Sequence, residues 1–335
     1  MSFNRLAPED FVVSSDSITA PLWTAGAPTL TQFYTSSTQV AGSSGNFYFN
    51  VYQVDTSLDS AEIQFAVAYG NLYGSGSSYY NQAVPGASPT RTTYGQYRTL
   101  VLGDENSSFN FGGTTSPDFW VISVDRNRYK QSLLPGTWTL NLSGSGGLLS
   151  LTDDSLVTPS TIFNDAGRVY QIISGSAGSI GGNPSLNGYS PAGSGSYGWF
   201  LPDIGTLLLN PKALSASINL ASSQSNNSDG LNYARLIDSM NLGGTFTMNS
   251  QETISSDYIF VRARNAEFNY SENPSFISGS TGEVIYNSFI NNPQTYPTTI
   301  GLYNDNNELL AVAKLSRPLL KDFTKEALVR VKLDF

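Results

Sequence analysis

The chain has 335 residues, a formal net charge of −9, and neither cysteine nor histidine. The missing cysteines exclude disulfides and thiolate chemistry, and the missing histidines exclude a Ser-His-Asp triad and the commonest transition-metal ligand. The acidic balance argues against nucleic acid as a partner, and no run of 18 apolar residues predicts a membrane-spanning helix.

Charged residues make up only 13% of the chain, about half the share of an ordinary globular domain. Gly, Ser, Thr, Asn and Tyr take their place, which is typical of a β-rich extracellular or particle-bound protein. The start, "MSFNRLAPEDFVV", lacks the apolar core of a secretory signal. We therefore expect a soluble chain that is synthesised in a cytoplasm, without a membrane partner.

Residues 1–45 are interpreted as an irregular N-terminal arm. Large apolar residues such as Phe11, Trp23 and Phe33 are interrupted by prolines and Ser/Thr runs, and their spacing fits neither a helix nor a long strand. Such an arm either wraps over its own domain or lies on another subunit. Phe11, Trp23 and Phe33 are therefore candidate interface residues.

From residue 46 the apolar period becomes two, as in Phe47, Phe49 and Val51. Further strands are predicted over residues 61–70, 98–103, 118–124 and 136–142. One short helix is predicted over residues 228–244, because an apolar stripe lies between an N-cap at Ser228 or Asp229 and a C-terminal stop near Gly243. The pattern predicts a β domain over residues 46–250.

Two long Gly/Ser/Tyr stretches interrupt this domain, at residues 71–97 and 174–198. Loops of that length inside a domain are usually functional or contact a neighbour. Tyr79 and Tyr80 are candidate interface residues, because exposed tyrosines serve both protein contacts and sugar stacking. The sequence leaves both uses open.

Residues 251–335 return to strands and predict a second β domain. Its strands are expected at residues 257–264, 282–289, 298–304, 308–315 and 327–335. In its last strand Val329, Val331, Leu333 and Phe335 alternate with polar residues, so one face must be covered. This strand is either the last core strand or a strand added to a neighbour's sheet. The predicted fold class is all-β, with two β-sandwich-like domains, the irregular arm and one short helix.

Basic residues gather at the C-terminal end, where residues 314–335 hold six of the chain's 17 lysines and arginines. Among them, Lys321, Lys325, Arg330 and Lys332 are candidate interface residues. One interpretation is a solvated outer face of two strands. The other is a positive surface that meets an acidic neighbour.

Catalytic and metal-binding alternatives are weak. A glycosidase would need two carboxylates that flank one bond, whereas the adjacent Asp153 and Asp154 point to opposite faces of a strand and suggest a surface turn. The oxygen-rich "YNDNNE" (303–308) could bind calcium, but the Asn and Asp residues fit a hairpin turn better. We expect no enzyme activity, no cofactor and no metal.

Four segments carry a resemblance to a known family: "FNYSENPSFI", "INNPQTYPTTIGLYND", "LLAVAKLSRPLLKDF" and the terminal "VKLDF". Residues 256–335 resemble the C-terminal module of virion structural proteins of contractile-tailed phages that infect cyanobacteria. Weaker similarity extends through "VAYGNLYGSGS", "YGQYRTLVLGDENSSF" and "SVDRNRYKQSLLPG". The resemblance implies a virion component without catalytic residues.

The sequence therefore predicts a non-enzymatic virion protein, placed in the tail or baseplate and made in the host cytoplasm. It would assemble with other virion proteins as a homo-oligomer, in a ring or a trimer. The alternatives are a neck or capsid-exterior protein, and a receptor-recognition module that binds a host surface glycan.

Overall fold

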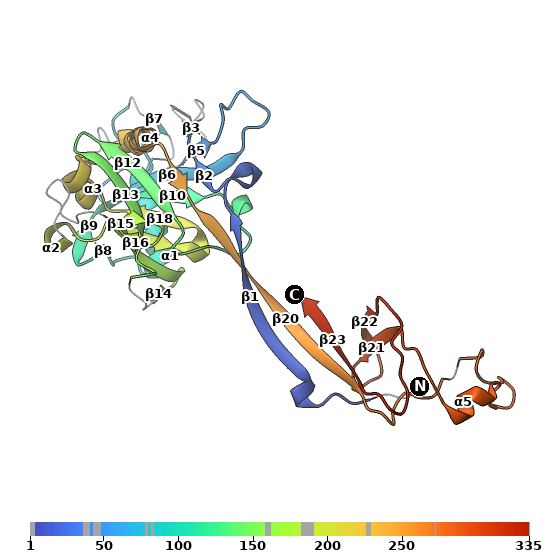
Figure 1. The fold of residues 1–335 in the computed structure, drawn as a ribbon. Coiled ribbons are helices and arrows are strands. Elements are labelled where there is room, and N and C mark those ends of the chain that lie inside the picture. Colours follow the sequence, from blue (N-terminus) through green and yellow to red (C-terminus); the bar gives the residue numbers. More distant parts are fainter. Residues whose placement is uncertain are drawn as a thin grey trace. The chain divides into compact units, whose positions relative to one another are not determined.

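The computed structural model describes residues 4–35, 41–42, 48–77, 80–81, 84–157, 162–181, 191–225, 229–271 and 273–334 (Figure 1). The chain divides into two compact units. Unit 1 is Met1–Ser17 together with Thr253–Phe335, and unit 2 is Ile18–Glu252. Strands predominate, which confirms the all-β class.

Unit 2 is built on one antiparallel sheet, which has 13 strands among the described residues. Across the sheet the order is β2 (Thr29–Leu30), β19 (Phe246–Thr247), β12 (Thr139–Gly144), β13 (Gly147–Asp153), β15 (Gly167–Ser176), β17 (Gly198–Leu201), β18 (Thr206–Leu209), β10 (Asp118–Val124), β6 (Ile63–Asn71), β5 (Phe49–Tyr52) and β3 (Tyr34–Thr35), with β14 (Ile162–Asn164) and β16 (Ser179–Ile180) paired to β15. Two separate pairs are β4 (Ala41–Gly42) with β7 (Tyr80–Asn81) and β8 (Phe109–Phe111) with β9 (Thr114–Ser116).

Short helices and turns complete the secondary structure. The helices are α1 (Thr90–Leu102), α2 (Pro191–Ser194), α3 (Pro211–Ile218), α4 (Asn232–Gly243) and, in unit 1, α5 (Asn287–Asn291). Single 3₁₀ turns are η1 (Pro8–Asp10), η2 (Thr24–Gly26), η4 (Arg126–Arg128), η6 (Pro202–Ile204) and η7 (Asp229–Leu231).

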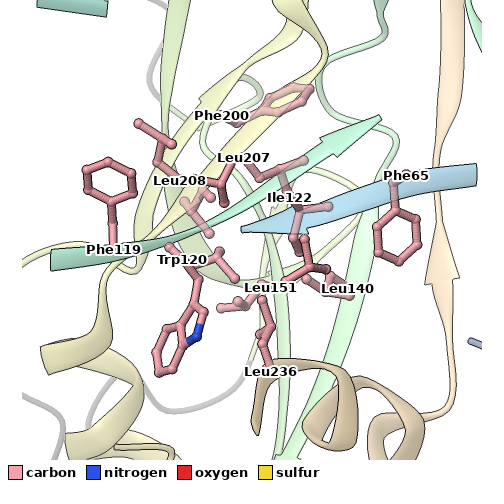
Figure 2. Packing of buried hydrophobic residues seen from close by; sticks show 14 of the residues in the cluster. Phe65, Phe119, Trp120, Ile122, Leu140, Leu151, Phe200, Leu207, Leu208 and Leu236 are labelled. Carbon is pink, nitrogen blue, oxygen red and sulfur yellow. The ribbon is translucent and has the colours of Figure 1, made fainter. Parts of the chain in front are cut away.

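Strand β10 lies at the centre of the core because it is covered on both edges and both faces. It pairs with β6 and with β18, whose residues Thr206–Leu209 are all buried. On one face the Phe119 ring stacks on Tyr94 of α1 at 5.2 Å. On the other, the indole N–H of Trp120 donates to the carbonyl of Asn232, the first residue of α4, at 2.9 Å. Figure 2 shows Phe119 and Trp120 leaving the strand in opposite directions, which explains its continuous apolar sequence.

The segment after β1 belongs to unit 2 and is docked on it. Leu22 and Trp23 are 2% exposed, and Leu30 and Phe33 are 5% exposed. The indole N–H of Trp23 donates to the carbonyl of Phe246 at 2.8 Å. For residues 22–33, the first interpretation of the arm, packing over its own domain, is therefore the one that the structure shows.

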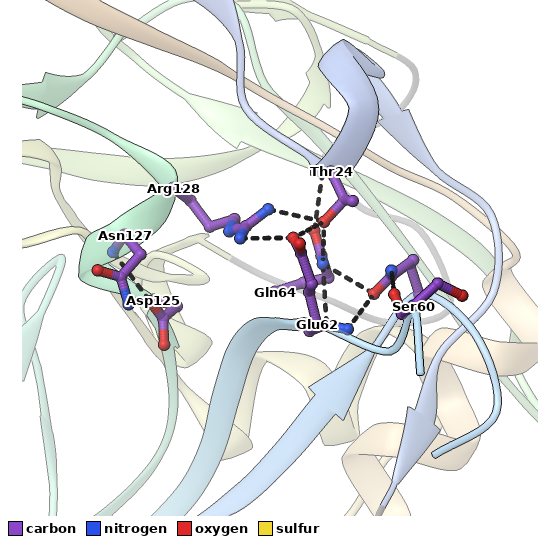
Figure 3. Close-up of polar contacts among 8 residues, drawn as sticks. Thr24, Ser60, Glu62, Gln64, Asp125, Asn127 and Arg128 are labelled. Atoms are coloured by element: carbon purple, nitrogen blue, oxygen red, sulfur yellow. Dashed lines mark hydrogen bonds and ion pairs between the residues drawn. The ribbon is translucent and has the colours of Figure 1, made fainter. Parts of the chain in front are cut away.

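A polar network holds the η2 turn of this segment in place (Figure 3). The Thr24 hydroxyl accepts hydrogen bonds from Gln64 Nε2 at 2.5 Å and from an Arg128 Nη at 2.7 Å, and donates to a carboxylate oxygen of Glu62 at 3.0 Å. Arg128 and Glu62 also form an ion pair at 2.7 Å. The hydrogen bond from Thr24, followed by Arg128, lowers the pKa of Glu62.

Unit 1 contains a small sheet and a separate hairpin. The sheet consists of β1 (Phe11–Pro21), β20 (Asn249–Ala263) and β23 (Ala327–Asp334), with β20 in the middle. At its unit 2 end β20 also pairs with β11 (Ser132–Leu133). The hairpin consists of β21 (Thr299–Tyr303) and β22 (Leu309–Lys314) and forms a two-stranded sheet of its own.

Several predicted elements are confirmed, including the strands at 118–124, 299–303, 309–314 and 327–334 and the helix at 232–243. Three predictions are wrong. The predicted arm contains the 11-residue strand β1, the predicted strand at 98–103 is the end of α1, and residues 287–289 of the predicted strand at 282–289 belong to α5. In α1, Tyr94, Tyr97 and Val101 are buried at helical spacing, so tertiary packing overrides the strand propensity of Thr, Tyr and Val.

Candidate assembly surface

Unit 1 buries few apolar side chains. Among its described residues the buried ones are Ile259, Phe289 and Val331, whereas the large core cluster lies wholly in unit 2. Seventeen large apolar side chains of unit 1 are exposed: Leu6, Phe11, Val12, Val13, Phe268, Tyr270, Ile285, Tyr286, Ile290, Tyr296, Tyr303, Leu309, Leu310, Val312, Leu319, Phe323 and Leu328. We call these residues the unit 1 apolar surface. Single exposed apolar residues are normal, but this density in one small unit makes these residues a candidate contact surface.

The hairpin β21–β22 contributes apolar residues on both of its faces. Ile300 pairs with Ala313 and Leu302 with Ala311, and this face is half-buried. On the opposite face Tyr303 pairs with Leu309, and both are exposed. An isolated two-stranded hairpin is marginally stable in water, so a hairpin that is apolar on both sides gains stability from a partner on its open face.

A one-residue bulge leaves Leu310 on the open face of the hairpin, where the regular alternation also puts Val312. The register shifts between Leu302 and Tyr303, which leaves Leu310 unpaired in the ladder and 68% exposed. Val312, opposite Gly301, is 57% exposed. Bulges of this kind re-aim side chains at sheet edges. The sequence "ELLAVAKL" already indicates apolar side chains on both faces of this strand, because apolar residues at consecutive strand positions point to opposite sides.

The turn of the hairpin is closed by asparagines. Asn304 Oδ1 accepts hydrogen bonds from the backbone N–H groups of Asn306 and Glu308, and Asn307 has a φ of 62°. The hairpin-turn interpretation of residues 303–308 is therefore confirmed. Within the described ranges, no group of three or more acidic residues is close enough to hold a metal ion.

The sheet of unit 1 has one apolar face and one mixed face. Ile259 pairs with Val331 and Val261 with Val329, and these side chains are buried or half-buried. On the mixed face Tyr258 pairs with Lys332. The predicted alternation of the last strand is confirmed for residues 327–334, while Phe335 lies outside the described residues.

The mixed face concentrates basic and aromatic groups around Tyr258. The Arg330 guanidinium lies 5.5 Å from the Tyr258 ring centroid and the Lys332 ammonium 5.9 Å from it. Lys332 also forms an ion pair with Asp334 at 2.9 Å. The side-chain hydrogen bond between Lys332 and Asp334 is the main reason why the pKa of Lys332 is raised. Asp16 on β1 makes a smaller contribution to the same shift. Tyr258, Arg330 and Lys332 therefore share a face of the sheet.

Three candidate residues from the arm and the basic segment do not lie on any exposed surface. Trp23 and Phe33 are buried in the core of unit 2, and Lys321 is 1% exposed. The Lys321 ammonium donates to the carbonyls of Asn265 at 2.9 Å and Asp322 at 3.1 Å, and to Asn269 Oδ1 at 3.0 Å. The expectation that Lys321 contributes to a positive outer surface is therefore wrong. Its ammonium group is buried and holds loop segments of unit 1 together through these hydrogen bonds.

The remaining candidates divide between exposed and undescribed positions. Phe11 is 44% exposed, and Lys325, Arg330 and Lys332 are exposed as well. Tyr79 lies outside the described residues, and Tyr80 is described only as backbone in β7. The interface function of Tyr79 and Tyr80 therefore stays a prediction.

Buried carboxylates in unit 2 have structural partners. Asp118 accepts hydrogen bonds from the Tyr69 hydroxyl at 2.6 Å and the Ser222 hydroxyl at 2.6 Å, and Asp229 accepts from Ser88 at 2.8 Å. Asp153, interpreted as a surface turn residue, is instead fully buried and accepts from the backbone N–H of Gly136 at 2.8 Å. Asp118 and Asp153 hold loop residues to strands of the sheet, and Asp229 holds the η7 turn to the start of α1.

None of the helices in the described parts of the chain has the length and apolar character needed to cross a membrane. Comparison of the chain with protein-family models, with curated proteins and with solved structures finds no match.

Proposed function

We propose that the chain is a non-enzymatic structural component of a contractile-tailed phage particle. It would sit in the tail or baseplate, with unit 1 as the part that attaches to neighbouring subunits. The observation that supports this function is the imbalance in unit 1, where 17 large apolar side chains are exposed and three apolar side chains are buried among the described residues.

The size of this surface suits a stable protein interface. A large side chain that is about half exposed offers roughly 100 Å² of apolar area, so even half of the unit 1 apolar surface supplies roughly 800 Å². That sum is about what each partner buries in a standard protein–protein interface.

The family resemblance is strongest over the same part of the chain. The segments at 268–277, 290–305 and 309–323 lie in unit 1 and hold 10 of its exposed large apolar residues. A resemblance to virion structural proteins and a surface built for contact thus coincide in one unit. Unit 2, which has a large core of its own, would carry unit 1 as a folded body.

The first test compares assembly of the wild type with that of a hairpin variant, Leu310→Lys with Val312→Lys. Both side chains are more than half exposed, so the variant is expected to fold. A matched control is Leu242→Lys in unit 2, where the side chain is 73% exposed. Sedimentation of the purified proteins and their recovery in phage particles are measured together.

We expect the wild type and the control to form oligomers and to enter particles, and the hairpin variant to do neither. Labelled antibody on the tail or baseplate would support the proposed station, and label on the head or neck would reject it in favour of the alternative station. Absence of the wild-type chain from purified particles would overturn the proposed function.

A further inference from the structure

The sheet of unit 1 has two open edges. β20 is the middle strand, and β1 lies along one side of it while β23 lies along the other. In the part of the chain that the structure describes, neither β1 nor β23 pairs with a further strand on its outer side. Edge strands present a row of backbone donors and acceptors that are ready to pair with another chain.

Strand β1 lacks most of the features that protect such an edge. Proline is absent until its last residue, Pro21, and Asp16 is its only charged residue. Phe11, Val12 and Ile18 are 44–49% exposed, and Val13 is 61% exposed. A long, apolar, unprotected edge strand is expected to acquire a partner.

The two edges carry opposite charge. Asp16 lies on β1, and Glu9 and Asp10 directly precede the first residue of that strand. Strand β23 carries two basic residues, Arg330 and Lys332, and one acidic residue, Asp334, on the mixed face of the sheet, so its net charge is positive. Lysine and arginine on an edge strand deter promiscuous pairing, but they favour a neighbour that brings carboxylates to the same face.

Each edge strand separates apolar from charged side chains. On β1, strand alternation puts Phe11 and Val13 on one face and Asp16 on the other. On β23, Val331 and Leu333 lie on one face and Arg330 and Lys332 on the other. Pairing β1 with a β23 strand so that the two apolar sets join would therefore continue an apolar face on one side and bring opposite charges together on the other.

We propose that the occupant of these edges is a second copy of this chain, with β23 of one copy added to β1 of the next. This inference rests on the proposed function, and it names the partner and the strands that join. One copy supplies a complement for each edge at once, whereas a different protein would have to bring two unlike strands. Head-to-tail contacts of this type close into a ring when the rotation between copies allows it.

The strand directions determine the type of pairing. β1 begins in unit 1 and ends in unit 2, whereas β20 begins in unit 2 and ends in unit 1, so the two paired strands run antiparallel. β23 is antiparallel to β20 as well. β1 and β23 are therefore parallel to each other, and a rotation axis along the strands pairs β23 of one copy in parallel with β1 of the next.

Cross-linking with introduced cysteines tests this arrangement, because the chain has no cysteine of its own. One variant is Ser14→Cys on β1, which shares a face with Asp16, and a second is Arg330→Cys on β23, which shares a face with Lys332. Ser60→Cys, an exposed position of unit 2, measures random collision. Equal amounts of the first two variants are mixed and treated with a short bis-maleimide, after their folding has been checked by thermal unfolding.

We expect a cross-linked dimer in the mixture of Ser14→Cys with Arg330→Cys, and only the Ser60→Cys background when each variant is treated alone. A cross-linked dimer of Ser14→Cys alone would overturn the inference in favour of two-fold β1 pairing. If the two variants form oligomers as the wild type does but give no cross-link above background, the inference is overturned as well. The proposed function would stand in that case. A chain that forms no oligomer and is missing from particles would reject both.

Discussion

The side-chain nitrogen of Lys321 lies 3.0 Å from the amide oxygen of Asn269, and both residues are buried in unit 1. The Asn269 side chain in turn donates to the carbonyl of Asn265 at 2.7 Å, and Lys321 exchanges two backbone hydrogen bonds of 2.9 Å with Thr295. With so few buried apolar residues, unit 1 depends on this polar junction to hold three segments together.

Replacing Lys321 by Met is expected to destabilise unit 1 by about 1–3 kcal/mol, because buried oxygen acceptors lose their donor. Hydrogen exchange of residues 265–269 and 293–297 should accelerate, while exchange in unit 2 stays unchanged. Lys325→Met is the matched control, since Lys325 is about half exposed and its ion pair with Asp322 is long, at 3.7 Å. Equal effects of the two substitutions would contradict the structural importance of the junction.

The arm residues Trp23 and Phe11 are expected to respond in opposite ways. Trp23→Ala removes a buried ring and its hydrogen bond to Phe246, and should cost about 3–5 kcal/mol of the free energy of unfolding of unit 2. Phe11→Ala removes an exposed side chain and should change the stability of the isolated chain by no more than about 0.5 kcal/mol. Denaturant unfolding measures both. We expect Phe11→Ala to weaken oligomers, and Trp23→Ala to lower the yield of folded protein.

Truncations at the N-terminus separate the residues that stabilise unit 2 from the residues that precede them in the arm. A chain that lacks residues 1–10 keeps Leu22, Trp23 and Leu30 and should retain a cooperatively folded unit 2. A chain that lacks residues 1–30 loses these three buried side chains and should fail to fold. Near-ultraviolet circular dichroism reports the packing of Trp120 in both truncated chains and that of Trp23 in the chain that lacks residues 1–10. Normal folding after the longer deletion would show that the docked segment does not stabilise unit 2.

The ion pair of Arg168 with Asp203 predicts a stability change in acid. Asp203 accepts from Arg168 Nη2 at 2.6 Å and from the Arg168 backbone N–H at 2.8 Å. Burial alone would raise the pKa of Asp203, but the bonds from Arg168 outweigh burial and lower it. The stabilisation is therefore complete above the pKa of an unfolded aspartate, about 4, and is lost as the pH falls through the lower pKa of the folded state.

Asp203→Asn should remove this part of the pH dependence. The difference in free energy of unfolding between wild type and variant should be constant near neutral pH and shrink in acid below about pH 4. Asp305→Asn is the control, because the pair of Asp305 with Arg5 has a distance of 3.5 Å and both side chains are at least 90% exposed. A difference for Asp203→Asn that grows on acidification would contradict a stabilising pair with a lowered carboxyl pKa.

Local patterns in the sequence were sufficient for the regular strands. Residues 118–124, 309–314 and 327–334 combine β-branched or aromatic side chains with clear boundaries, and the hairpin turn at Asn304 follows from the preference of Asn for tight turns. The helix α4 was predictable because an apolar stripe at helical spacing ends at Gly244, which has a φ of 83°. These features depend on neighbours within a few positions.

Other features were decided only by the tertiary structure. Residues 90–102 have the composition of a strand or loop, but contact with Phe119 turns Tyr94 and Tyr97 into one buried face of a helix. Lys321 and Lys325 are alike in the sequence, and only the fold buries the first and exposes the second. The candidate assembly surface was visible only in part, because "ELLAVAKL" indicates apolar residues on both faces of a strand but does not show whether the chain itself covers Leu310. Burial is a property of contacts between distant segments, and those contacts form only when the whole chain folds.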